Sequence, residues 1–89
     1  MALTKETVVD KIEVLEMGQV QVRTATRVKE DGTVLSTSFH RHVVEPSTKA
    51  SGSWADTDIS GEDARVQAVA NATWTSAVKT AYQEMIDAL

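Results

Sequence analysis

The chain has 89 residues, contains no cysteine and carries a formal net charge of −4 at pH 7. This length suits one small domain, and the lack of cysteine excludes disulfides and thiolate zinc sites. The acidic balance disfavours general binding to nucleic acid. We expect neither a membrane span nor a secretion leader, because no long apolar run is present. Alanine and valine dominate the hydrophobic residues, so we expect a thin core that gains stability by association.

Residues 7–44 alternate between apolar and polar side chains, which predicts β-strands. The clearest strand covers 19–29, with Val and Thr on one face and mainly Gln, Arg and Lys on the other. Asp31-Gly32 is typical of a two-residue hairpin turn. Such a turn would pair Val28 with Leu35. Continued along the hairpin, this register places Phe39 opposite a threonine on the buried face.

The strand before 19–29 has two alternative connections. A two-residue loop at Met17-Gly18 mixes the apolar and polar faces. A three-residue loop over 16–18, with Gly18 in the left-handed region, sets Val14 opposite Val20 and keeps the apolar face intact. We therefore expect the longer loop and a three-stranded antiparallel meander, with strands near 7–15, 19–29 and 33–44.

Residues 46–60 are rich in Ser, Thr and Asp and follow neither period, which predicts a linker. Ser60 has the spacing of a capping-box N-cap, so a helix is expected to begin near Gly61. Weak helix formers in the middle of the last segment predict a kink or break, giving helices near 61–72 and 76–88. The sequence thus predicts a single small α+β domain over 1–89, composed of a meander (1–45), a linker (46–60) and a helical segment (61–89).

His40 and His42 are the one pair worth testing as metal ligands, because alternate strand residues project to the same face. The predicted register places them beside Arg23 and Gln21, with Glu13 as a further carboxylate. Neighbouring cations and the lack of other His or Cys ligands disfavour a metal, so we expect solvated or interface histidines. Because no nucleophile, phosphate-loop or dinucleotide motif is present, we expect no catalytic activity and no cofactor.

Two further features indicate protein contacts. The strands carry several cations without surface aromatics for base stacking, which favours a solvated or subunit-facing surface over nucleic acid. Trp54 is a large aromatic in a polar segment, so it is expected to dock on its own domain or on a partner. The outer strands near 7–15 and 33–44 are alternative pairing edges. The predicted interface residues are Trp54, His40, His42, Arg23 and Arg27.

Seven segments of the chain form a pattern that extends over most of its length: Asp10–Val14, Gln21–Arg27, Glu30–Gly32, Phe39–Val43, Gly61–Val66, Trp74-Thr75 and Ala81-Tyr82. In these segments the chain resembles short uncharacterised proteins of tailed bacteriophages. Those proteins come from the structural, tail-proximal gene region, and the resemblance brings no catalytic residues. It implies a virion or assembly component, made in the host cytoplasm, that contacts itself or larger phage structural proteins. A phage-encoded regulator of a host protein or nucleic acid is the alternative.

Overall fold

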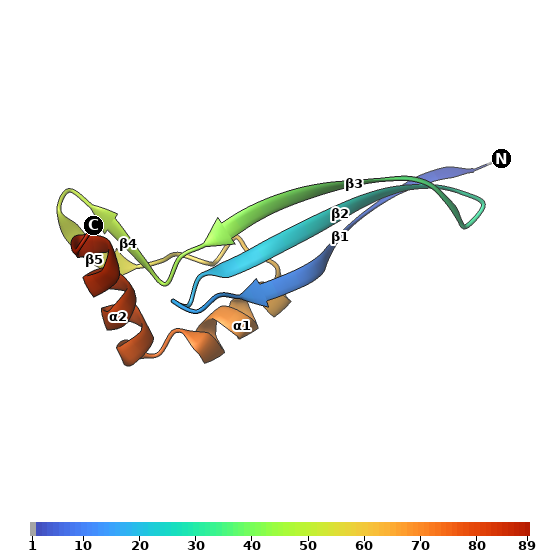
Figure 1. The fold of residues 1–89 in the computed structure, drawn as a ribbon. Helices are drawn as coiled ribbons and strands as arrows, with labels where there is room; N and C mark the ends of the chain where they lie inside the picture. Colours follow the sequence, from blue (N-terminus) through green and yellow to red (C-terminus); the bar gives the residue numbers. More distant parts are fainter. Residues whose placement is uncertain (1) are drawn as a thin grey trace.

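The computed structural model describes residues 2–89 as two antiparallel sheets and two C-terminal helices (Figure 1). The larger sheet has the order β1-β2-β3. In chain order the elements are β1 (Leu3–Val14), β2 (Val20–Glu30), β3 (Thr33–Val44), β4 (Ser47–Ala50), β5 (Ser53–Asp56), α1 (Ala64–Thr73) and α2 (Ser76–Asp87). The predicted α+β class and the three-stranded meander are confirmed. No helix in this part of the chain is long and apolar enough to cross a membrane.

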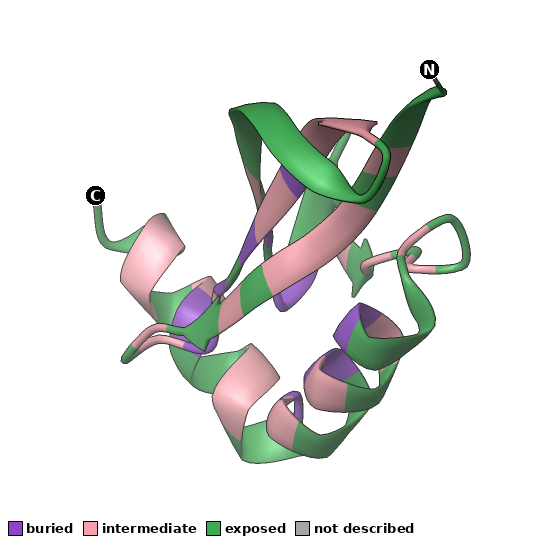
Figure 2. Ribbon diagram, turned by 90° about the vertical axis from the view of Figure 1, so that its right-hand side faces the viewer, coloured by how far each residue is buried: buried purple, intermediate pink, exposed green. Residues whose placement is uncertain are grey.

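The molecule is elongated, with principal extents of 56 × 23 × 21 Å. Both helices lie at one end of the large sheet, and its other half projects beyond them (Figure 1). Buried residues gather where the helices meet the strands (Figure 2). The core cluster consists of Val20, Val22, Val44, Val66, Ala70 and Trp74. These side chains are mostly small, and they lie where the helices meet the sheet. The hydrophobic stabilisation is therefore concentrated at the helical end of the sheet.

The connection between β1 and β2 is the predicted three-residue loop. The backbone N–H of Leu15 donates to the carbonyl of Gln19 at 2.8 Å, and Gly18 has a φ of +87°. Val14 lies opposite Val20. The Gly18 carbonyl accepts a hydrogen bond from Trp74 Nε1 at 2.7 Å, so the loop is tied directly to the helices.

The hairpin of β2 and β3 starts as predicted and then changes register. Asp31 and Gly32 both have positive φ, as the two-residue turn requires. Val28 lies opposite Ser36, however, and the extra residue Leu35 forms a β-bulge. The predicted pairing of Val28 with Leu35 is wrong because the bulge moves all later pairs by one residue.

The bulge brings Val44 opposite Val20, so that both valines enter the core. It also places Phe39 opposite Ala25 rather than opposite a threonine. Phe39 consequently lies on the face away from the helices, where half of its surface is exposed. The expectation of a buried Phe39 is therefore wrong.

The segment predicted as a linker contains the β4–β5 hairpin, so it is more ordered than its composition indicates. Helix α1 begins later than expected, with Asp63 rather than Ser60 as its N-cap; the Asp63 side chain accepts a hydrogen bond from the Arg65 backbone N–H. The predicted break between the helices is confirmed, and Thr75 caps α2.

Candidate protein-interaction surface

The face of the large sheet opposite the helices carries no second layer (Figure 1). We call it the open face. Side chains alternate between the two faces of a strand, and the observed register assigns the residues of this face. Its central part consists of Lys11, Glu13, Gln21, Arg23, Ala25, Phe39, Arg41 and Val43. This face therefore presents charged and half-exposed apolar side chains together.

Most cations of the open face are already paired with acids of β1. Arg23 donates to both carboxylate oxygens of Asp10, at 2.9 and 2.8 Å. Glu6 lies 2.7 Å from Lys29 Nζ and 3.7 Å from Arg27 Nη1. The hydrogen bond from Arg23 lowers the pKa of Asp10, and the hydrogen bond and charge of Lys29 lower the pKa of Glu6. Arg23 and Arg27, both predicted interface residues, thus brace the sheet internally.

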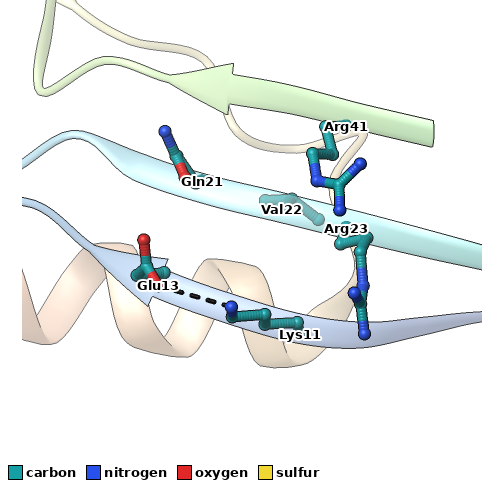
Figure 3. Close-up of a pocket in the computed structure, with 6 residues that line it drawn as sticks. All are labelled: Lys11, Glu13, Gln21, Val22, Arg23 and Arg41. Carbon is teal, nitrogen blue, oxygen red and sulfur yellow. Dashed lines mark ion pairs between the residues drawn. The ribbon is translucent and has the colours of Figure 1, made fainter. Parts of the chain in front are cut away.

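Arg41 differs from these cations. It lies beside a shallow hollow over β1 and β2, where Lys11 is paired with Glu13 at 3.5 Å (Figure 3). Within residues 2–89 Arg41 makes no ion pair. Nearby, the Arg23 guanidinium sits 4.5 Å from the centre of the Phe39 ring. The open face therefore combines one cation without an acidic partner and one half-exposed aromatic ring on the same strand, β3.

His40 and His42 lie on the helix-covered face, opposite Thr24 and Val22. The prediction that they flank Arg23 and Gln21 is wrong, because the bulge at Leu35 exchanges the faces. Their rings are stacked with centroids 6.3 Å apart, and His42 Nε2 lies 2.7 Å from Glu62 Oε1.

Glu13, the expected further carboxylate, lies on the open face, away from both histidines. No cluster of three or more His, Cys, Asp or Glu residues that could hold a metal ion occurs in the described range. The structure thus gives His42 a hydrogen-bond partner, Glu62, in the segment leading into α1.

Trp54 docks on its own domain, one of the two alternatives that the sequence left open. Its Nε1 donates to Asp87 Oδ2 at 3.2 Å, and its ring meets Tyr82 edge-on with centroids 6.1 Å apart. Lys49 Nζ lies 2.8 Å from Asp87 Oδ1 and 5.5 Å from the centre of the Trp54 ring. Hydrogen bonds from Lys49 and Trp54 lower the pKa of Asp87. These contacts fasten the β4–β5 hairpin to α2.

The two free edges of the large sheet differ in how they are protected. Strand β1 carries Lys5 and Lys11 and is interrupted in the middle by a bulge at Asp10. Strand β3 has neither Lys nor Pro and carries one arginine, Arg41, and its bulge at Leu35 lies near the hairpin tip. Every residue from Thr33 to Arg41 is exposed. Charges, prolines and bulges are the usual devices that stop edge strands from pairing, so β3 is the less protected edge.

We found no match to the chain among protein-family models, curated proteins or solved structures. The functional argument therefore depends on the chemistry of the open face and of the β3 edge.

Proposed function

We propose that this chain is a non-enzymatic structural or assembly protein of a tailed bacteriophage, which acts through protein–protein contacts as a homo-oligomer. The sequence resemblance supports the phage origin. The exposed and less protected β3 edge supports the mode of action, and it is the observation on which the proposal depends. The protein would be made in the host cytoplasm and reside in the virion.

The shape of the molecule supports a contact role. Its core lies at one end, while the projecting half of the sheet contributes exposed backbone edges and few buried side chains. Leu35, Phe39 and Val43 on β3 are each about half exposed. Exposed apolar groups along an open strand are typical of surfaces that become covered in an assembly.

The same surface gives less support to nucleic-acid binding. A protein that binds the phosphate backbone needs Lys and Arg side chains free to replace counterions. Here Arg23, Arg27 and Lys29 are neutralised by acids on β1. The net charge of −4 adds a general repulsion.

The test is the location of the protein during infection. Particles of the phage that encodes the chain are purified on a density gradient, and the chain is quantified by mass spectrometry against the major capsid protein. We expect a constant copy number per particle across gradient fractions. A chain abundant in the infected-cell lysate but absent from particles would contradict the proposal and favour the regulator of a host protein. An abundant host protein measured in the same fractions controls for contamination.

A further inference from the structure

We propose that the β3 edge pairs with β3 of a second copy, antiparallel about a two-fold axis at Phe39, so that one sheet continues across both copies. This inference rests on the proposed function and deepens it by naming the partner and the surface. It follows from three properties of β3: its exposed length, the side chains it presents and the position of the helices relative to it.

The first property is the extent of the free edge. An edge strand presents unpaired N–H and C=O groups that another strand can satisfy. From Ser36 to Val44 the pairing of β3 with β2 contains no further bulge. The strand therefore offers a regular edge over these residues. The bulge at Asp10 interrupts the corresponding stretch of β1, which disfavours that edge.

The second property is self-complementarity. A two-fold axis at Phe39 places the two half-exposed Phe39 rings directly opposite each other. Arg41 then lies opposite Thr37 of the second copy, and no like charges are directly opposed. An axis at Arg41 would instead place two arginines face to face, which is unfavourable for like-charged side chains.

The same register gives Arg41 a partner. Residues diagonal to one another across antiparallel strands are within reach of long side chains. Arg41 would thus reach the Phe39 ring of the second copy, repeating the contact that Arg23 makes with Phe39 within the chain. An arginine over an aromatic ring is favourable, and more so when both become desolvated. The pairing therefore covers the half-exposed Phe39 ring and gives Arg41, which has no ion-pair partner, a favourable contact.

The third property is the position of the helices. In an antiparallel pair centred on Phe39, the Val44 end of one β3 lies beside the tip of the other. Both helices of each copy lie at the Val44 end (Figure 1). The thicker ends of the two copies therefore lie far apart and do not obstruct the pairing. A parallel arrangement would bring them together on the same side.

The test compares two positions that are matched in the structure. Val8 on β1 and Phe39 on β3 both lie opposite Ala25 on the open face, one at each edge of the sheet. Sedimentation equilibrium over a wide concentration range measures the dimer dissociation constant of the wild type. We expect Phe39→Lys to raise it roughly tenfold or more, and Val8→Lys to change it by less than about threefold. Circular dichroism of each variant verifies that it is folded.

Cysteine cross-linking tests the register independently of any loss of stability. The chain has no native cysteine, so Phe39→Cys and Val8→Cys each introduce a single thiol. Because Phe39 lies on the proposed axis, Phe39→Cys should form a covalent dimer under mild oxidation, whereas Val8→Cys should remain largely monomeric.

Three outcomes would overturn the inference: a wild type that is monomeric at every concentration, equal cross-linking of both variants, or equal weakening by both lysines. None of these would remove the chain from purified particles. Conversely, a β3-dependent dimer that is absent from particles would refute the proposed function alone.

Discussion

Gly18 is the position where a single added methyl group should damage the fold most directly. Its φ of +87° lies in the region where an L-residue costs about 1–2 kcal/mol. A Cβ built there would lie 2.5 Å from Val78 Cγ1 and 3.2 Å from Pro46 Cγ. Such overpacking typically costs another 1–3 kcal/mol or so. We therefore expect Gly18→Ala to lower the free energy of unfolding by about 2–5 kcal/mol.

Urea denaturation followed by tryptophan fluorescence measures this loss, and Gly32→Ala is the matched control. Gly32 has nearly the same φ, +86°, but nothing lies within 4 Å of its added Cβ. It should therefore show only the conformational cost. Adding Val78→Ala to Gly18→Ala should recover part of the steric cost, which a double-mutant cycle detects as coupling. Equal destabilisation by Gly18→Ala and Gly32→Ala would refute the argument that the loop is packed tightly against α2.

Three other predictions concern different parts of the molecule. Deleting Leu35 removes the bulge but keeps every other residue of β3 opposite its present partner on β2. The free energy of unfolding should therefore change by less than about 1 kcal/mol, and NMR should still find residues 22 and 42 adjacent. The hydrogen bond from Arg23 lowers the pKa of Asp10 in the folded protein, so the Arg23–Asp10 pair stabilises the fold above the pKa that Asp10 has in the unfolded chain, and this stabilisation is lost on acidification. Asp10→Asn should therefore flatten the loss of stability below about pH 4, as measured by denaturation at a series of pH values. Burial raises the pKa of Tyr82 to about 12, so absorbance titration of this single tyrosine should show ionisation well above pH 10, accompanied by falling stability.

The features that the sequence predicts well are those decided by local chemistry. A left-handed glycine, an Asp-Gly turn and a run of weak helix formers each specify one backbone feature. Those at Gly18, Asp31-Gly32 and residues 71–76 are all found in the structure. Trp74 continues an apolar helical stripe and lies in the core. Each of these features needs information from only a few neighbouring residues.

The features that the sequence missed depend on distant contacts. The β4–β5 hairpin has polar strands, and its order comes from Trp54 and Lys49 meeting Asp87 on α2. Nothing in residues 46–60 signals that partner. Asp63 likewise prevails over Ser60 as the cap of α1, although both have suitable side chains.

The bulge at Leu35 allows β3 to keep both the tight turn at Asp31-Gly32 and the core pairing of Val44 with Val20. It also determines which side chains the open face presents. The turn at Asp31-Gly32 specifies one register, while burial of Val44 opposite Val20 requires another that differs by one residue. Since a one-residue change reverses the faces of a strand, the bulge moves His40 and His42 to the helix side and Phe39 and Arg41 to the open face. Without it, the aromatic ring would be directed toward the helices and the open face of β3 would carry two histidines. The side chains proposed to meet across the two-fold axis are therefore there because the core sets the register of β3.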